Sequence, residues 1–211
     1  RTLFPYTTLF RSIVMATGAI ERPLVFSNND RPGVMLASAL RTYANRYAVA
    51  PDKRAVIAAN NDTAYQVALD RADAGVPVTV ADHRAAVSAD ILSRAGAKGI
   101  AIFPGSGIFD VEGSKGVRRV KLGGAHAVTI ECDVVGMAGG WSPVVHLSSH
   151  GGIKPKYDES VAGFVPGGFP ASHFGAGAMM GTFGLSAAVA EGANAGASAA
   201  SSAGFGKTRP V

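Results

Sequence analysis

The chain has 211 residues, of which 47% are hydrophobic and 17% are charged, and its formal net charge is +5. This length suits one or two domains with a sizeable core. The Lys and Arg residues form no long basic run, which argues against a nucleic-acid-binding face. Because Cys132 is the single cysteine, an internal disulfide is excluded and a reducing compartment is favoured. No apolar run approaches the roughly 20 residues of a membrane span, so we expect a cytoplasmic protein without membrane or nucleic-acid partners.

The first twelve residues, RTLFPYTTLFRS, have no clear periodicity and join abruptly to an apolar run that begins at Ile13. The segment from Thr2 to Ser12 looks like a widely used DNA-sequencing adapter translated in one frame. We therefore interpret residues 1–12 as a non-native artefact and leave them out of the fold prediction. The alternative is a genuine amphipathic N-terminal arm. On the artefact interpretation, the natural protein extends upstream of Ile13 and this chain is truncated at its N-terminus.

Residues 13–50 predict one strand and one helix. The strand covers residues 13–18 and ends in the small-residue turn Ala16, Thr17 and Gly18. A polar loop punctuated by Pro and Gly follows. Residues 35–48 then predict a helix. One face of this helix carries Leu36, Leu40, Tyr43 and Tyr47.

Residues 51–140 begin with alternating strands and helices. The predicted strands cover residues 54–59, 78–82 and 99–105, and the predicted helices cover residues 62–74 and 85–97. This β-α-β-α-β order predicts a parallel sheet with right-handed crossovers. From residue 106 onward, short strands with Gly turns predict a meander. The last of them, residues 127–140, contains Cys132, which we expect to be a small core residue.

Beyond Trp141 the pattern predicts a strand over residues 162–166 and a small-residue helix from about Gly181. Residues 204–211 read as a truncated linker. His146 and His150 have the i, i+4 spacing that can bind a metal on a helix, but a nearby proline and two glycines leave room for only a very short helix. We favour a loop histidine near a cofactor or partner over a metal ligand. We predict no metal site.

The turn after the strand at residues 54–59 resembles a dinucleotide-binding turn without its glycines. Such a turn needs three small residues, so that the chain bends, approaches the pyrophosphate and packs helix on sheet, and the phosphates bind the helix N-terminus. The run ANNDTA places Ala59, Asn61 and Ala64 at these positions. Asp82 ends the next strand, where an acid can bind a ribose hydroxyl. Asp62 and Thr63 also suit an ordinary helix N-cap, so spacing alone leaves the nucleotide site open.

A second signal comes from five segments taken together. They occur in the order and spacing found in the alpha subunit of heterotetrameric sarcosine oxidase, which this chain resembles from about Ile13 to Ala200. The segments are ATGAIERPLVFSNNDRPGVMLASALRTY, NNDTAYQVALDRADAGV, GGWSPVVHLSSHGG, YDESVAGFVPG and GTFGLSAAVAEGANAG. Related amine-oxidising complexes share much of this module. In that family the same turn is also Asn-Asn-Asp, so the lost glycines match its pattern.

The resemblance implies an α/β fold, the Rossmann-like two-dinucleotide-binding-domain flavoprotein fold, in which a second domain is inserted into the first. Residues 13–50 and 141–203 would form parts of an outer FAD/NAD-type domain, and residues 51–140 an inserted NAD-type Rossmann domain. The resemblance further implies cofactor-binding residues at the two crossings between domains, at the Asn-Asn-Asp turn and at the FGAG segment. The predicted set is Ala16, Thr17, Gly18, Ala59, Asn60, Asn61, Asp62, Ala64, Asp82, Gly139, Gly140 and Gly177. One departure is Ala178, where related flavoproteins often carry an Asp that holds the flavin.

The resemblance also implies an activity. The complex would oxidise the amine sarcosine to glycine, releasing formaldehyde and hydrogen peroxide, with FAD and FMN in the complex and NAD in this chain. Its partners would be beta, gamma and delta subunits, and this chain would supply nucleotide binding without a catalytic residue of its own. The alternatives are a non-catalytic assembly module and the alpha subunit of a related opine, proline or amine dehydrogenase.

Overall fold

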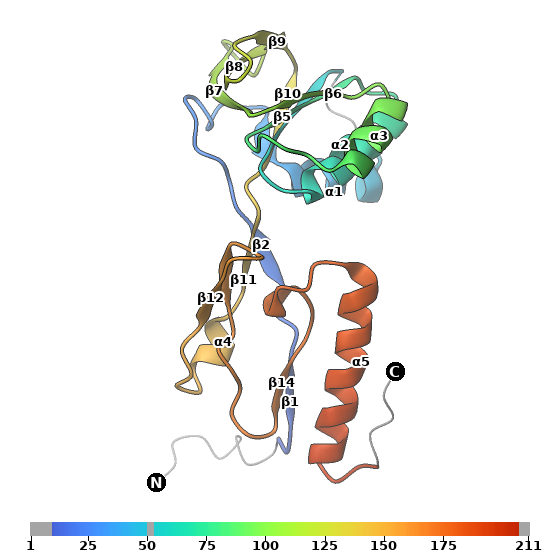
Figure 1. Cartoon of the computed structure of the whole chain (residues 1–211), viewed down its shortest axis with the longest axis vertical. Helices are drawn as coiled ribbons and strands as arrows, with labels where there is room; N and C mark the ends of the chain where they lie inside the picture. Colours follow the sequence, from blue (N-terminus) through green and yellow to red (C-terminus); the bar gives the residue numbers. More distant parts are fainter. Residues whose placement is uncertain (1–9, 50–52, 207–211) are drawn as a thin grey trace. The chain divides into compact units, whose positions relative to one another are not determined.

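The computed structural model describes residues 10–49 and 53–206 and divides the chain into two compact units (Figure 1). Unit 1 consists of Arg1–Ile20 with Trp141–Val211, and unit 2 is Glu21–Gly140. Most of the segment interpreted as an artefact, residues 1–9, lies outside the described residues. The same holds for residues 50–52 and for residues 207–211, the larger part of the expected linker.

Unit 2 is built on a five-stranded sheet with the order β3-β10-β4-β5-β6. Every hydrogen-bonded pair of neighbours in it is parallel. Parallel sheets are covered on both faces, and their strands are therefore nearly continuous apolar runs; all residues of β4 and β10 are buried. The strands are β3 (Val34–Leu36), β4 (Ala55–Ala59), β5 (Val78–Asp82), β6 (Ala101–Pro104) and β10 (Val134–Ala138).

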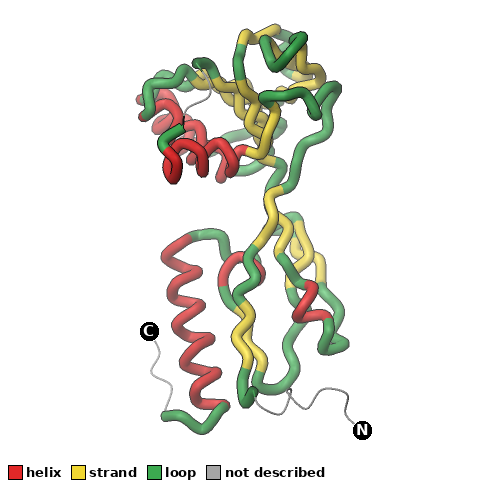
Figure 2. Tube along the Cα trace, turned by 180° about the vertical axis from the view of Figure 1, so that it is seen from behind, coloured by secondary structure: helices red, strands yellow, loops and turns green. Residues whose placement is uncertain are grey.

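Helices cover one face of this sheet and a small antiparallel sheet covers the other, as Figures 1 and 2 show for unit 2. Alternate residues of a strand point to opposite faces, so Ile57 packs under the helices while its neighbour Val56 packs under the small sheet. The helices are α1 (Ala37–Tyr47), α2 (Thr63–Asp73) and α3 (Ala89–Ala97). The small sheet consists of β7 (Ser106–Glu112), β8 (Arg119–Gly124) and β9 (Thr129–Glu131).

The start of unit 2 differs from the sequence prediction. Residues 34–36 form β3, paired with β10, so Met35 and Leu36 are strand residues instead of the first turn of a helix. On α1, Leu40 is fully buried, whereas Tyr43 and Tyr47 are 45% and 58% exposed. The first boundary between the units consequently falls between Ile20 and Glu21 instead of after residue 50. The physical reason is the pairing of β3 with a strand about 100 residues later in the chain, which no local pattern reveals.

Unit 1 brings the first strand together with the end of the chain. Strand β1 (Ile13–Met15) pairs in parallel with β14 (His173–Gly175), and α5 (Leu185–Ser202) runs beside both (Figures 1 and 2). The remaining elements are β2 (Ala19–Glu21) paired with β11 (Trp141–Pro143), the hairpin β12 (Lys156–Asp158) and β13 (Gly163–Val165), the short helix α4 (His146–Ser149) and the 3-10 turn η2 (Gly177–Met180). Over the residues described, no helix is both long and apolar enough to cross a membrane.

The predicted strand over residues 127–140 is split. Strand β9 belongs to the small sheet and β10 to the parallel sheet, and Cys132 lies between them, fully buried in the core between the two sheets. Its expected role as a core residue is confirmed. Burial raises the pKa of its thiol to about 12, with the neighbouring Asp133 charge adding to the shift.

We predict that Cys132 does not react with a disulfide reagent such as 5,5′-dithiobis(2-nitrobenzoate) at pH 8 while the protein is folded. The reactive species is the thiolate, and both burial and the raised pKa suppress it. The absorbance of the released thiol should appear only when denaturant is added. Rapid stoichiometric reaction of Cys132 in the native protein would contradict its position in the core.

Asp70 on α2 holds α1 in place. Its carboxylate accepts hydrogen bonds from Arg41 Nε (2.7 Å), Asn45 Nδ2 (2.8 Å) and Gln66 Nε2 (2.7 Å). Burial acts to raise the Asp70 pKa, but the hydrogen bonds from these three side chains and the Arg41 charge outweigh it and lower the pKa below its usual 3.8. The ionised carboxylate is thus the form that the fold stabilises.

We expect Asp70→Asn to reduce the free energy of unfolding by about 1 kcal/mol at pH 7. Because the folded pKa is depressed, this contribution is fully present above pH 4 to 5 and is lost as the pH falls through the folded pKa. Urea unfolding at pH 7 and at pH 3 measures the difference. Asp73→Asn is the matched control, since Asp73 pairs with Lys98 on the exposed surface and should change stability by less than about 0.5 kcal/mol.

Candidate functional site

Eight of the predicted cofactor-binding residues meet at one edge of the parallel sheet in unit 2. Ala59 ends β4, and its register partners Asp82 and Ala138 end β5 and β10. The carboxyl ends of all three strands therefore lie together, and α2 begins at Thr63, a short turn after the end of β4. The eight residues are Ala59, Asn60, Asn61, Asp62, Ala64, Asp82, Gly139 and Gly140.

The strand order places a topological switch point between β4 and β10. From β4 the chain turns into α2 and on to the neighbouring strand β5, whereas β10 is reached from β6 by way of the small sheet, and after β10 the chain leaves the parallel sheet. In open parallel sheets, ligands bind in the crevice beyond the strand ends at such a point. The predicted nucleotide turn is thus in the place where a Rossmann-like sheet binds its ligand.

Two asparagines bridge this crevice. Asn60 donates from its backbone N–H to Ala138 O (3.3 Å) and from Nδ2 to Gly139 O (3.3 Å). Asn61 Nδ2 also donates to Ala138 O (2.9 Å). A glycine at position 61 would have no side chain to make this contact, whereas here two amide side chains tie the turn after β4 to the end of β10. This role was not visible in the sequence, because Ala138 lies 77 residues after Asn61.

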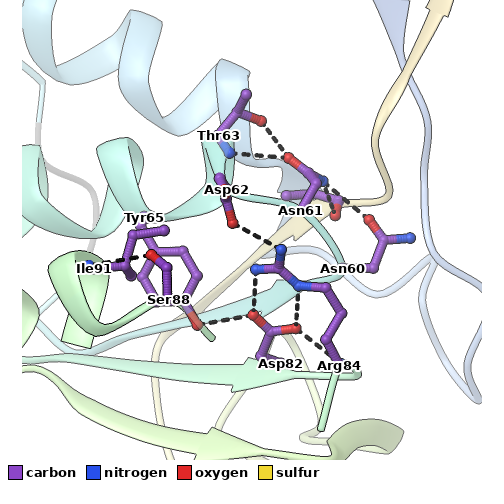
Figure 3. A network of polar contacts seen from close by, with 10 residues as sticks. Asn60, Asn61, Asp62, Thr63, Tyr65, Asp82, Arg84, Ser88 and Ile91 are labelled. Carbon is purple, nitrogen blue, oxygen red and sulfur yellow. Dashed lines mark hydrogen bonds and ion pairs between the residues drawn. The ribbon is translucent and has the colours of Figure 1, made fainter. Parts of the chain in front are cut away.

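The start of α2 is capped by Asn61, whose Oδ1 accepts a hydrogen bond from Thr63 N (3.1 Å) (Figure 3). Asp62 occupies the N-cap position, but its side chain makes no capping hydrogen bond, and Asn61 supplies the acceptor for the Thr63 N–H instead. The Asp62 carboxylate instead accepts a hydrogen bond from Arg84 Nη1 at 2.7 Å. Asp62 is thereby directed at Arg84, and its negative charge lies at the start of α2, where the helix dipole favours an anion.

Asp82 is fully buried and already surrounded by donors (Figure 3). Its Oδ1 accepts from Arg84 N (2.9 Å) and Arg84 Nε (3.1 Å). Its Oδ2 accepts from Arg84 Nη2 (2.8 Å) and Tyr65 OH (2.8 Å). A ribose hydroxyl that binds Asp82 must consequently displace one of these donors. The signal that the sequence offered was an arginine two residues after the acid.

The pKa values in this network follow from the same contacts. The hydrogen bond to Asp82 raises the pKa of Arg84, burial opposes the rise, and Asp62 adds to it. Burial raises the pKa of Tyr65, and its hydrogen bond to Asp82 raises it further. Arg84 is thus a cation and Tyr65 a neutral hydroxyl donor at any physiological pH.

A cavity of about 300 Å³ lies beside the network, between α2 and α3. Asp62, Tyr65, Ser88, Asp90 and Ile91 are among its lining residues. Ser88 caps α3 by accepting a hydrogen bond from Ile91 N (3.4 Å). The cavity is therefore walled by the facing sides of α2 and α3, with hydroxyl, carboxylate and guanidinium groups among its lining side chains.

Gly139 and Gly140 allow the chain after β10 to pack closely against the backbone of Arg22 and Pro23. Gly139 N donates to Arg22 O (2.9 Å) and Arg22 N donates to Gly140 O (2.8 Å). A Cβ on Gly139 would lie 2.5 Å from Arg22 O and 2.8 Å from Pro23 O. Gly140 has a φ of +90°, which favours glycine. Their small size is thus explained by close backbone packing at the end of β10.

The other four predicted residues, Ala16, Thr17, Gly18 and Gly177, lie in unit 1. Thr17 Oγ1 donates to Val144 O (2.6 Å) and Gly18 O accepts from Val144 N (2.9 Å). Gly177 N donates to Glu191 Oε2 on α5 (2.7 Å). The predicted set therefore forms two groups, one in each unit. Glu191, next in space to the Gly177–Ala178 step, was not among the predicted residues.

The histidine pair is placed by α4, a helix of four residues that begins at His146. His150 follows it and lines a cavity of about 240 Å³ in unit 1 with Met15, Leu147 and His173. Among the described residues, no three His, Cys, Asp or Glu side chains are grouped so that they could hold a metal ion.

The residues of unit 2 fit a dinucleotide in part. In favour are the parallel sheet, the switch point, the start of α2 and the acid at the end of β5. The bridging asparagines and the Arg84 contacts with Asp82 occupy hydrogen-bonding groups that a dinucleotide would use. A dinucleotide at this edge would therefore exchange its own hydrogen bonds for some of these internal ones.

The strand order of unit 2 and the division of the chain into two units define the class of protein. It has an α/β fold of the Rossmann-like flavoprotein type. L-proline dehydrogenase from P. horikoshii has the same fold over 94% of this chain and 36% of its own, with a TM-score of 0.68 and 20% identity. Thioredoxin reductase from T. acidophilum has it over 91% of this chain and 64% of its own, with a TM-score of 0.67 and 18% identity. These likenesses confirm the predicted fold class.

The resemblance to one particular kind of protein comes from the comparison of sequences. Sarcosine oxidase subunit alpha from Corynebacterium sp. (strain P-1) is 40% identical over 222 residues, which cover 94% of this chain and 23% of that protein. The subunit alpha from Rhizobium meliloti (strain 1021) is 40% identical over 182 residues, covering 85% of this chain and 18% of that protein. No protein-family model matches the chain. The predicted resemblance to sarcosine oxidase subunit alpha is confirmed, and the chain spans about a fifth of the length of these relatives.

Proposed function

We propose that this chain is the nucleotide-binding part of the alpha subunit of a multisubunit sarcosine oxidase. The observation that carries the proposal is 40% identity to sarcosine oxidase subunit alpha over 94% of the chain. The complete enzyme would be an FAD- and NAD-dependent oxidoreductase acting on the CH–NH group of sarcosine. It would form glycine, formaldehyde and hydrogen peroxide, in a cytoplasmic complex with beta, gamma and delta subunits that also holds FMN.

Within this proposal unit 2 binds NAD. The start of α2, with Asn61, Asp62 and Ala64, would face the pyrophosphate, and Asp82 would face the adenosine ribose. A nicotinamide dinucleotide supplies hydride transfer when it is bound. The chain itself binds and orients the nucleotide. We assign Ala16, Thr17, Gly18 and Gly177 of unit 1 to an outer FAD-type domain.

The test is to express the full-length protein with its partner subunits, purify the complex, denature it and analyse the released nucleotides by chromatography. We expect NAD and flavins to be released and sarcosine to drive peroxide formation by the complex. The alpha chain alone should form no peroxide from sarcosine. Peroxide formation without a partner subunit would overturn the assignment.

A second candidate is a non-catalytic assembly module, and it has structural support of its own. Asn60 and Asn61 bridge the crevice at the switch point, and Asp82 is saturated with internal donors. If release experiments give flavin but no NAD, unit 2 only supports the complex.

The alpha subunit of a related opine, proline or amine dehydrogenase is the other alternative, and the fold shared with L-proline dehydrogenase supports it. Comparing the rates at which the complex oxidises sarcosine and proline distinguishes a sarcosine oxidase from a proline dehydrogenase.

A further inference from the structure

The edge of the parallel sheet carries two features that select opposite dinucleotides. An acid at the end of the second strand accepts a hydrogen bond from a free ribose 2′-hydroxyl, whereas a nearby arginine accommodates a 2′-phosphate. Here Asp82 and Arg84 stand two residues apart, and both point into the same network. The sequence alone therefore leaves the choice open. The contacts of Arg84 decide it.

Arg84 is held by two carboxylates at once. Its Nε and Nη2 donate to Asp82 at 3.1 and 2.8 Å, and its Nη1 donates to Asp62 at 2.7 Å. Each of the three guanidinium nitrogens thus donates to a carboxylate, which fixes the orientation of the planar group. To turn toward a phosphate it would leave the buried Asp82 carboxylate without its charge partner, which is costly.

The charge of the network points the same way. Asp62 and Asp82 carry two formal negative charges against the single positive charge of Arg84, which leaves a net charge of −1. A phosphate monoester brings about −1.5 to −2 more, and like charges in a shared site repel. A neutral 2′-hydroxyl meets no such repulsion, and it can donate to a carboxylate oxygen.

We propose that Asp62 is a positioning residue that sets dinucleotide specificity: by holding Arg84 against Asp82, it makes this edge select a dinucleotide with a free 2′-hydroxyl over a 2′-phosphorylated one. The inference rests on the proposed nucleotide-binding function of unit 2. Asp62 suits this role because its side chain is 65% exposed while that of Asp82 is fully buried. Removing the Asp62 charge therefore frees Arg84 Nη1 without emptying a buried position.

The test uses the complete enzyme complex, freed of bound nucleotide, and measures the binding of NAD and of NADP by isothermal titration calorimetry. The wild-type complex should bind NAD at least about tenfold more tightly than NADP, which corresponds to about 1.4 kcal/mol. Asp62→Asn should raise NADP affinity about tenfold and change NAD affinity by less than about threefold. Adding Arg84→Gln to Asp62→Asn should abolish the gain, because the gain depends on the Arg84 Nη1 group that Asp62 no longer engages.

Asp90→Asn is the matched control, because Asp90 lines the same cavity but pairs with Arg94. It should leave the ratio of the two affinities unchanged. An Asp62→Asn variant that binds NAD normally with an unaltered ratio overturns the role of Asp62 and leaves the proposed function intact. A wild-type complex that prefers NADP also overturns it. If neither dinucleotide binds to the wild-type complex, the proposed function of unit 2 fails, and this inference fails with it.

Discussion

Replacing Gly139 by alanine is expected to lower the free energy of unfolding of unit 2 by about 3 kcal/mol. The new Cβ would lie 2.5 Å from Arg22 O and 2.8 Å from Pro23 O, and both are backbone atoms. The backbone cannot move aside cheaply, since Gly139 and Gly140 are hydrogen-bonded to both the N–H and the C=O of Arg22. Urea unfolding followed by circular dichroism measures the loss.

Gly96→Ala is the control for this experiment. Gly96 lies exposed in α3, and among the described residues no atom outside its two chain neighbours and the backbone of its own helix comes within 4 Å of a Cβ built there. Alanine has the higher helix propensity, so this variant should gain about 0.5 to 1 kcal/mol. Equal stability of Gly139→Ala and the wild type would show that the chain does not pack as closely at the end of β10 as the structure indicates.

Replacing Asp82 by alanine is expected to cost about 3 kcal/mol of stability, within the range for breaking a buried ion pair. The substitution leaves Arg84 and Tyr65 facing the emptied position, with three side-chain donors deprived of their acceptor. Tyr65→Phe removes one donor and keeps the ion pair, so it should cost only about 1 kcal/mol. Thermal unfolding of the two variants measures the difference. If Asp82→Ala unfolds like the wild type, the network does not stabilise the fold.

This expected cost affects how nucleotide binding at Asp82 is tested. If Asp82 contacts the adenosine ribose, Asp82→Ala should also weaken nucleotide binding. A weaker affinity could then come from the lost contact or from a loosened edge of the sheet. Affinities should therefore be compared at a temperature where the variant is fully folded by circular dichroism, with Tyr65→Phe as the reference for a disturbed network. Unchanged affinity in the folded variant would place the ribose elsewhere.

The sequence determined the elements that depend on local physics. The apolar runs that became β4, β5 and β6 and the helices between them were predictable, because buried parallel strands are continuous apolar segments and their crossovers are helical. The positions of Ala59 and Asp82 at strand ends followed from the same alternation. The combination of motifs also showed the resemblance to sarcosine oxidase subunit alpha over nearly the whole chain.

The tertiary structure decided what depends on contacts between distant residues. Residues 34–36 became a strand because β10 offered them hydrogen-bonding partners about 100 residues later, and this moved the boundary of unit 2. Asn61 looked like a substitute for a glycine, and only the position of the end of β10 made it, together with Asn60, a bridge between the strand ends. Asp62 stands 22 residues before Arg84, and folding alone brought it close enough to share that guanidinium with Asp82. Local propensity specifies where a strand or helix forms. The partner of a polar side chain depends on which strand ends lie next to each other once the sheet has formed.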